Sequence, residues 1–347
     1  MTCAVTFFGH ARVTYQRGAR RPSGFTLVEL LTTIGIIGMA ASLIMPAVMA
    51  GRATARRGQC MDHLRQLGIA ASSYQSAYSV FPLTTAGIGV QPADLPRSIS
   101  PHAQLLPYLE LEAVFSRIDF SEPGSLASGK PVSNVNAQLL TLAVPVFLCP
   151  DDKAVAGANN YRANMGVIPS PGIIVRSSTP NLPGESNTGA FRINRALSPS
   201  TFTDGLANTA MFSEKLVGGL DPSWFDPPRD CFYSPFQIDL VDDAVLACQS
   251  PPSTNPPHDA YCGMTWLFGG YDQSWYNHIF TPNSPAPDCA STHAGGHGAY
   301  SARSFHAGCV NVAFADGSVH SINENLELAV WRALATRAGG EAITTNF

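Results

Sequence analysis

The sequence predicts an α+β fold in which one long N-terminal helix, transmembrane in its first half and amphipathic in its second, packs on a loop-rich antiparallel β domain. Three observations support this prediction. Residues 25–50 form an apolar run that contains a single charge, that of Glu29. An apolar stripe at helical spacing follows over residues 60–78, and alternating apolar residues with an Asp-Gly pair indicate a hairpin over residues 305–322.

The composition is that of a loop-rich protein with a sizeable core. The chain has 347 residues, of which 45% are hydrophobic and 13% charged, against about 25% charged in an average protein. It contains 27 prolines and 30 glycines, which favours an extracytoplasmic β protein over a helical cytosolic enzyme. The formal net charge of −4 gives no electrostatic argument for a nucleic-acid partner, because such proteins present basic surfaces.

The N-terminus predicts a membrane segment. Residues 1–24 contain four arginines and no acid. As a helix, residues 25–50 would be about 40 Å long, which exceeds a hydrocarbon core of about 30 Å. The apolar part of a removable signal peptide is shorter, about 7–15 residues. A plain transmembrane anchor fits this run equally well but leaves Glu29 unexplained, because an acid at the bilayer centre costs roughly 2.5–3.5 kcal/mol.

The helix is expected to continue beyond the membrane as an amphipathic segment over residues 51–81. Apolar residues recur there at alternating spacings of four and three, namely Cys60, Leu64, Leu67, Ala71, Tyr74 and Tyr78. The segment is expected to end at Phe81-Pro82, because a residue that precedes proline is pushed out of the helical region. Residues 82–347 then form the globular domain.

The globular domain is expected to combine short strands with long connections. Residues 102–115 read as a helix and residues 144–152 as a short strand that enters a turn. Residues 221–300 are rich in Pro, Asp, Ser and Cys with little periodicity, and are predicted to be an irregular insert.

The C-terminal pattern is clearer. Val310, Val312 and Phe314 alternate with small or polar residues, which predicts a half-buried strand. Asp316-Gly317 suits a type I′ turn before the return strand. An amphipathic helix is expected over residues 324–339, stopped by two glycines.

The stretch "GFTLVELL", residues 24–31, resembles the cleavage and methylation site of type IV prepilins and type II secretion pseudopilins. The resemblance implies that a prepilin peptidase removes a leader of residues 1–24, long for this group, by cutting between Gly24 and Phe25 and then methylates the new N-terminus. Glu29 becomes the fifth mature residue. Pro46 falls where pilins often carry a helix-breaking proline.

This resemblance gives Glu29 an expected role in assembly. The mature amine of Phe25 and the carboxylate of Glu29 are both costly in lipid, and they neutralise one another when neighbouring helices pack together. The expected partners are therefore other pilin-like subunits or further copies of this chain.

The C-terminal segment resembles a narrower family, the prepilin-type proteins that carry a domain of unknown function numbered 1559 with an H-x9-DG motif. That motif is His306, nine residues, then Asp316-Gly317. The stretches "FLCPDD", "NNYRANMG", "DGLANT…SEK" and "TPNSPAPDC" also look like recurrent segments of this family. The resemblance implies a pseudopilin-like architecture and supplies no enzyme activity.

Alternative chemistry was weighed at three places. A metal reading draws on five side chains in a stretch that is mostly Gly, Ala and Ser: His293, His297, His306, Cys289 and Cys309. An acid–base pair of His306 and Asp316 is disfavoured, because an extended strand would separate them by roughly 30 Å; a buried histidine bonded to backbone and a turn aspartate are expected instead. Loop acids at 151–152 or 242–243 offer a calcium alternative. No cofactor motif occurs, so neither a cofactor nor a metal is expected.

The cysteines predict disulfides. Seven of the eight follow the expected cut, beyond the membrane run, where an oxidising compartment allows bridges. Cys60 and Cys149 are paired first, as a buried helix face meeting a strand end. Four others can form two more bridges in three connectivities, namely Cys231, Cys248, Cys262 and Cys289. Cys309 is then the odd one.

The expected function is structural rather than enzymatic. The chain is expected to be an inner-membrane, single-pass prepilin-like protein with its C-terminal domain in the periplasm or on the cell surface, assembling in a type II secretion or type IV pilus-like system. One alternative is an adhesin or cargo-binding protein that displays residues 221–300. A membrane-anchored enzyme using His306 and Asp316 is the weaker alternative.

Overall fold

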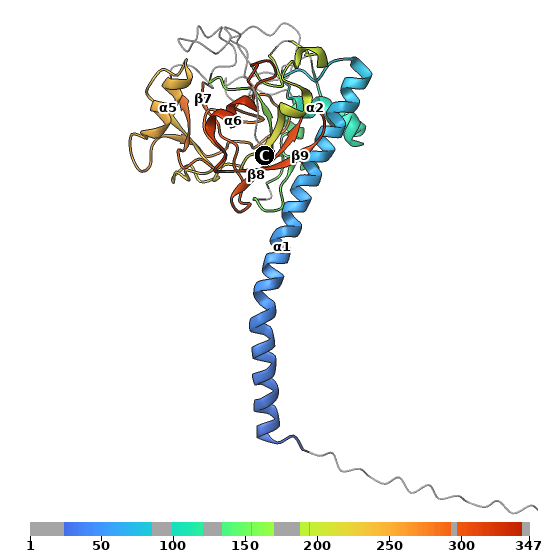
Figure 1. Ribbon diagram of the computed structural model, residues 1–347, viewed down its shortest axis with the longest axis vertical. Coiled ribbons are helices and arrows are strands. Elements are labelled where there is room, and N and C mark those ends of the chain that lie inside the picture. Colours follow the sequence, from blue (N-terminus) through green and yellow to red (C-terminus); the bar gives the residue numbers. More distant parts are fainter. Residues whose placement is uncertain are drawn as a thin grey trace, which may run out of the picture. The chain divides into compact units, whose positions relative to one another are not determined.

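The computed structural model describes residues 24–84, 99–120, 134–153, 155–169, 188–193, 195–292 and 297–341. All of the predicted leader except Gly24 lies outside the described residues. The chain divides into two compact units, Met1–Gly51 and Arg52–Phe347, and each is described by itself. Figure 1 shows the elements in sequence colours.

The first unit contains the N-terminal half of helix α1 (Leu27–Tyr78), which is drawn in blue in Figure 1. Pro46 lies inside α1 without ending it. Every residue from 24 to 50 is exposed, and α1 is the single described helix that is long and apolar enough to cross a membrane. The apolar side chains of this half are therefore exposed along its whole described length.

The second half of α1 belongs to the globular unit and buries one face. Its buried residues are Cys60, Leu64, Leu67, Gly68, Ala70 and Ala71. The helix ends at Tyr78, three residues before the predicted end, because Ser79 takes a left-handed conformation with φ of 63°. Phe81 then turns inward and is 2% exposed. An extended Phe81 is what the following proline requires.

A five-stranded sheet forms the centre of the globular unit. Its strands, in the spatial order β5-β1-β2-β8-β9, are β5 (Trp275–Tyr276), β1 (Tyr161–Asn164), β2 (Ala210–Glu214), β8 (Cys309–Phe314) and β9 (Val319–Asn323). Strands β1 and β5 pair in parallel and the other pairs are antiparallel. The sheet is thus mixed, where an antiparallel one was predicted.

Both faces of this sheet are buried. Ala313 belongs to the core that α1 covers, whereas Val310, Val312 and Phe314 pack with Trp331 on the opposite face. Strand β8 is consequently buried at all six positions, where a half-buried strand was predicted. The alternation was real, but small residues such as Ala313 occupy the second face, and helix packing excludes water from it.

A second sheet occupies the region predicted to be an irregular insert, which corrects that prediction. Its strands, in the order β4-β3-β6-β7, are β4 (His258–Asp259), β3 (Cys231–Ser234), β6 (Asp288–Ser291) and β7 (Gly298–Ala299). Helix α5 (Val241–Gln249) packs beside it on a separate small core. Strands of two to four residues are too short to show a period in the sequence, which is why the region looked irregular.

The remaining elements are short. They are α2 (Pro101–Leu105), α3 (Glu112–Phe115), α4 (Asn134–Leu139), α6 (Leu328–Ala333) and the 3-10 helices η2 (Leu106–Leu109), η3 (Pro145–Phe147), η4 (Pro199–Thr201) and η5 (Leu206–Asn208). The predicted helix over 102–115 is therefore broken, with Glu110 left-handed at φ of 62°. The stretch 144–152 holds a 3-10 turn instead of a strand.

The C-terminal hairpin has a different turn from the predicted one. Gly317 has a φ of 88°, but Asp316 does not take positive φ, so the turn is not type I′. The amide of Gly317 donates to Phe314 O at 2.9 Å, and a three-residue loop with a left-handed glycine results. Helix α6 is shorter than the predicted 324–339, and directly after its end the carbonyls of Leu334 and Ala335 accept from Ala210 N and Asn164 Nδ2, at 2.8 Å each.

Candidate functional site

The start of α1 is organised around Glu29. The Glu29 carboxylate accepts hydrogen bonds from the backbone amide of Thr26 at 2.9 Å and from its hydroxyl at 2.8 Å. The Glu29 amide donates in return to the Thr26 hydroxyl at 3.2 Å. This reciprocal pattern is a capping box. Glu29 therefore has a local role at the helix start that the sequence analysis did not assign, and Thr26 brings it no counter-charge.

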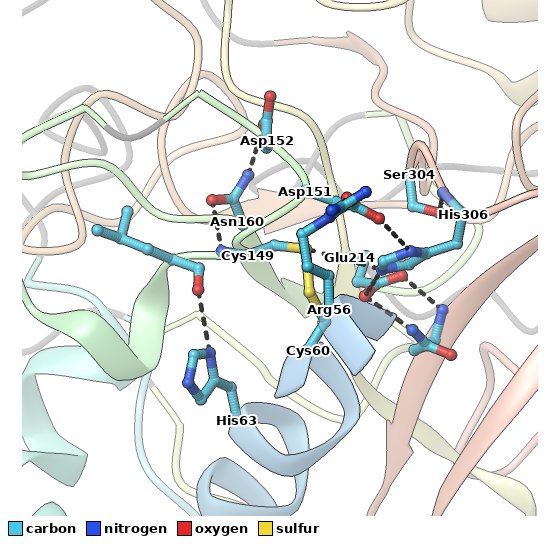
Figure 2. Close-up of a disulfide and its surroundings, with 12 residues drawn as sticks. Arg56, Cys60, His63, Cys149, Asp151, Asp152, Asn160, Glu214, Ser304 and His306 are labelled. Atoms are coloured by element: carbon cyan, nitrogen blue, oxygen red, sulfur yellow. Dashed lines mark hydrogen bonds and ion pairs between the residues drawn. A yellow bond between two sulfur atoms is a disulfide. The ribbon is translucent and has the colours of Figure 1, made fainter. Parts of the chain in front are cut away.

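His306, the first residue of the H-x9-DG motif, lies between two carboxylates. Its Nδ1 is 3.0 Å from Asp151 Oδ2, and its Nε2 is 3.1 Å from Glu214 Oε1 (Figure 2). The side chain of His306 is 2% exposed. The His306 amide donates to the Ser304 hydroxyl at 3.1 Å, which holds the loop that presents the ring. The prediction that His306 bonds to backbone was wrong about its side-chain partners.

The two carboxylates set the charge of the ring. Burial alone lowers the pKa of His306, but the hydrogen bond and charge of Glu214, together with the charge of Asp151, outweigh it. The pKa of His306 is therefore raised, despite the opposing charge of Arg57. A histidine that faces a carboxylate at each nitrogen donates from both, which only the imidazolium form can do.

The same centre joins the second half of α1 to the domain. Cys60 of α1 and Cys149 form a disulfide, with a Cα–Cα separation of 5.2 Å. The Cys149 sulfur lies 3.7 Å from His306 Nε2 (Figure 2). One turn before Cys60, Arg56 forms an ion pair with Asp151. Two residues that contact His306, Cys149 and Asp151, are thus bound to α1, one by a disulfide and the other by an ion pair.

Glu214 is also bound from the neighbouring strand. Its Oε2 accepts the Asn311 amide at 2.8 Å, and its Oε1 accepts the Asn311 side chain at 2.9 Å. The Asn311 oxygen in turn accepts the Ser321 hydroxyl of β9 at 2.6 Å. Glu214, Asn311 and Ser321 belong to adjacent strands, so sheet pairing places this carboxylate under the histidine.

A second network of buried charges begins at Lys215, the residue after Glu214. Asp288 forms ion pairs with Lys215 and Arg303, and all three side chains are at most 5% exposed. Burial alone raises the pKa of Asp288, but the two cations outweigh it, so its pKa is lowered. Arg303 also donates to Ser284 O and Ala286 O at 2.5 Å each. Through Lys215, the residue directly after β2, this network joins the end of β2 in the first sheet to β6 of the second.

Three of the four acids that suggest a calcium site, Asp151, Asp152 and Asp243, already accept from protein donors. Asp151 faces His306 and Arg56, while Asp152 contacts Arg229 at 2.7 Å and the Asn160 amide at 2.7 Å. Asp243 caps the start of α5 by accepting the Leu240 amide at 2.9 Å. A hard cation needs several free oxygens, and these carboxylates are saturated by protein donors.

His306 and Asp316 do not act on one another. The Asp316 carboxylate is exposed and accepts from the amide and hydroxyl of Ser318 at 2.9 and 2.7 Å, which stabilises the turn. Gly317 has a second role, because a Cβ on Gly68 of α1 would lie 3.1 Å from the Gly317 Cα. The turn therefore also serves as a close contact between the hairpin and the helix.

The cluster weighed as a metal site is divided among different partners. Cys289 is bonded to Cys248, and His297 faces Asp239 at 3.5 Å; His293 lies outside the described residues. Elsewhere, ligand atoms of Cys60, Cys149, Glu214 and His306 lie within 4.8 Å of one another. There the two sulfurs are bonded to each other, so the set cannot offer two thiolates to zinc.

Of the four cysteines left open by the sequence, the structure joins Cys248 to Cys289. Cys231, Cys262 and Cys309 are reduced and buried. Sequence reasoning missed four charged residues that organise the interior, namely Glu214, Lys215, Asp288 and Arg303. A signal was present, since three of them lie within the recurrent segments that resemble the family.

Comparisons with known proteins agree with both resemblances. The model of the family described as "Protein of unknown function (DUF1559)" matches residues 49–329, and that of the prokaryotic N-terminal methylation motif matches residues 19–45. Type II secretion system core protein G of Klebsiella pneumoniae is 34% identical over 88 residues, 25% of this chain and 61% of that protein. Its counterpart in Dickeya chrysanthemi is 33% identical over 70 residues, 20% of this chain and 46% of that protein.

The chain thus spans about half to three fifths of the length of these curated relatives. No solved structure matches it significantly. The methylation motif and the similarity to protein G support a pilin-like or pseudopilin-like protein. Because the larger match covers most of the chain, including the buried His306 centre, this protein belongs to the DUF1559 family.

Proposed function

We propose that this chain is the precursor of a structural subunit, cleaved between Gly24 and Phe25, N-methylated by a prepilin peptidase and assembled through residues 25–50. One observation carries the proposal: Glu29 is the single charge in an exposed apolar helix, and it follows Gly24 by five residues. The side chains from Phe25 to Met49 are exposed and largely apolar, which favours lipid and neighbouring subunits as their surroundings.

The charge of Glu29 favours assembly over simple anchoring. The groups that contact its carboxylate belong to Thr26 and are uncharged. Cleavage would create an amine at Phe25, and the amine of a neighbouring subunit would supply the missing counter-charge. An anchor needs no such acid, whereas a packed bundle gains register from it.

The remaining features favour a location outside the cytoplasm. Two disulfides in the globular unit suit an oxidising compartment. The single-pass helix would lie in the inner membrane, with the globular unit in the periplasm or on the cell surface. The machine would be of the type II secretion or type IV pilus kind, with pilin-like subunits as partners.

The first experiment identifies the mature N-terminus by mass spectrometry in cells that express prepilin peptidase. We expect a chain that begins with methylated Phe25. Gly24→Arg should remain uncleaved, whereas Ser23→Ala should be processed normally. A chain that begins at Met1, or after Ala50, would contradict the proposal.

The second experiment separates the two roles of Glu29. Glu29→Gln keeps the hydrogen bonds of the capping box but removes the charge, whereas Thr26→Ala removes the cap and keeps the charge. We expect cross-linked oligomers to be lost in Glu29→Gln and retained in Thr26→Ala. Oligomers of wild-type yield in Glu29→Gln would show that the charge is not used for assembly.

A second candidate function is cargo or surface recognition by residues 221–300. Large apolar side chains are exposed there, namely Trp224, Tyr233, Phe236, Leu246 and Tyr261. Deleting the region would remove β5 from the central sheet, so a deletion is a poor test. Trp224→Ser with Phe236→Ser should instead weaken cargo recovery while leaving oligomers intact. Unchanged recovery would argue against this function.

We also propose that the chain is not an enzyme that uses His306. Both ring nitrogens face carboxylates, and the adjacent Cys149 sulfur is in a disulfide. A catalytic histidine needs one nitrogen available to exchange a proton with substrate. A hydrolase activity that His306→Gln abolishes without lowering the melting temperature would contradict this proposal.

A further inference from the structure

Cys231 and Cys262 are two buried cysteines that the structure brings together from separate segments. Cys231 is the first residue of β3, and Asp259 of β4 lies opposite it. Cys262 follows three residues after Asp259, where the chain leaves the second sheet. The two cysteines are 2% and 1% exposed. Both belong to the large core that also contains α1.

The alternation of side chains along β3 limits the partners available to Cys231. In the parallel pair of β3 and β6, Phe232 lies opposite Cys289, and Cys231 lies opposite Asp288. Phe232, Cys248 and Cys289 share the small core beside α5. Because neighbouring residues of a strand point to opposite faces, Cys231 faces away from the Cys248–Cys289 bridge. On its own face, Cys231 meets Cys262.

Contacts at the sulfur atoms agree with this placement. The Cys262 thiol donates to Asp259 O and Oδ2 at 3.7 Å each, and Asp259 is the residue that pairs with Cys231 between β3 and β4. The guanidinium of Arg162, which is fully buried, lies against Gly263 next to Cys262. Among the residues that the structure describes, none is hydrogen-bonded to two nitrogens of Arg162, Nε and Nη2. The thiols thus form a close pair in a dry interior.

We propose that Cys231 and Cys262 form a third disulfide in the protein as it is made in the cell. The oxidant is a protein or small molecule that carries a disulfide. The Cys262 thiolate attacks one sulfur of that disulfide, and the other sulfur of the oxidant leaves as a thiolate. The Cys231 thiolate then attacks the Cys262 sulfur of the mixed disulfide and displaces the second. Two protons and two electrons leave the cysteine pair, and the oxidant becomes a dithiol.

Burial dictates when the bridge forms. The Cys231 side chain and burial raise the pKa of Cys262, which keeps the folded pair as inert thiols. Oxidation therefore precedes closure of the core. The resulting loops, 231–262 and 248–289, overlap in sequence, and their bridges lie on opposite faces of the second sheet. A sheet of very short strands is thereby held on both sides.

Peptide mapping tests the proposal on the full chain purified from membranes without reductant. The protein is unfolded in denaturant with iodoacetamide and digested, and alkylation is quantified at each cysteine. Cys309 provides the internal control, because it is a buried thiol with no bridge. We expect Cys309 to be alkylated, Cys231 and Cys262 to be protected, and a linked peptide that contains both.

Alkylation is also measured in two variants, each with a single cysteine replaced. In Cys231→Ser, Cys262 should become alkylated to the extent of Cys309, whereas in Cys309→Ser it should stay protected. Alkylation of Cys231 and Cys262 in a wild-type protein whose Cys60–Cys149 and Cys248–Cys289 bridges are intact would overturn the proposal. Alkylation of all of these cysteines would overturn it together with the proposed extracytoplasmic location.

Discussion

The two halves of helix α1 carry their key polar groups in different settings. In the first half, Glu29 is exposed, and its carboxylate accepts hydrogen bonds from the uncharged amide and hydroxyl of Thr26. In the second half, Arg56 and Cys60 reach partners in the same chain, Asp151 and Cys149. The first half therefore exposes its apolar side chains, while the second is part of a folded domain. The following predictions test that division.

The largest loss of unfolding free energy is expected from a substitution of Glu214, the glutamate that is buried in the globular unit. Glu214→Ala leaves His306 and Asn311 without their acceptor, and breaking a buried ion pair costs about 3–5 kcal/mol. All four tryptophans lie in the globular unit, so their fluorescence in denaturant reports its free energy of unfolding.

Two controls accompany this variant. Glu327→Ala, at an exposed acid, should stay within about 0.5 kcal/mol of wild type. Glu29→Ala should leave the fluorescence midpoint unchanged, because its carboxylate takes no part in the globular unit. A shift in Glu29→Ala equal to that in Glu214→Ala would remove the distinction between the two halves.

The disulfide that joins α1 to the domain should rank second. Cys60→Ser opens a loop between residues 89 apart, and losing such a bridge costs about 2–4 kcal/mol. The measurement is again the unfolding midpoint without reductant. Because reductant opens the same bridge in wild type, the two proteins should converge when both are reduced. A gap that persists in reductant would assign the effect to packing at Cys60.

The hairpin turn should give a smaller effect. Gly317→Val places a β-branched residue at φ of 88°, at a cost of about 1–3 kcal/mol. The nearest atom to an added Cβ is 3.7 Å away, so the cost arises from the backbone and not from a clash. Gly317→Asn should therefore be milder, because asparagine tolerates this region.

A milder change at the neighbouring position completes the test of the turn. Asp316→Asn keeps an acceptor for Ser318 and should lower the unfolding midpoint less than Gly317→Val. Equal midpoints for Gly317→Val and Gly317→Asn would contradict the backbone explanation.

The smallest change in the unfolding midpoint is expected from a change of pH that titrates His306. The pKa of His306 is raised in the folded state, so its stabilisation is complete below the unfolded value of about 6.5 and declines as the pH rises through the folded value. The gap in unfolding midpoint between wild type and His306→Gln should therefore narrow from about pH 6 to about pH 9.

Two other histidines give stability the opposite pH dependence, but their contribution is the same in wild type and in His306→Gln. Burial lowers the pKa of His102 and of His278 to about 3, so both stabilise the fold less as the pH falls below about 6.5. They are present in both proteins. A gap that widens with rising pH would contradict the imidazolium assigned to His306.

Much of the fold followed from the sequence. The long helix, its buried stripe and the hairpin could be predicted because each depends on residues a few positions apart. The second sheet could not, since its strands are two to four residues long and two of them pair in parallel across a long connection. Helix ends were also displaced, as at Ser79, because local turns and inward-facing residues decide them.

The candidate site divides in the same way. By itself the sequence determined that Glu29 stands alone in an apolar run, that Gly317 belongs to a turn, and that cysteines follow the membrane segment. Only the tertiary structure decided that His306 meets Glu214, 92 residues away, and Asp151 rather than Asp316. It also decided which face of the second sheet each cysteine occupies. Local chemistry fixes what a residue can bind, whereas sheet register and helix packing bring distant partners within hydrogen-bond distance.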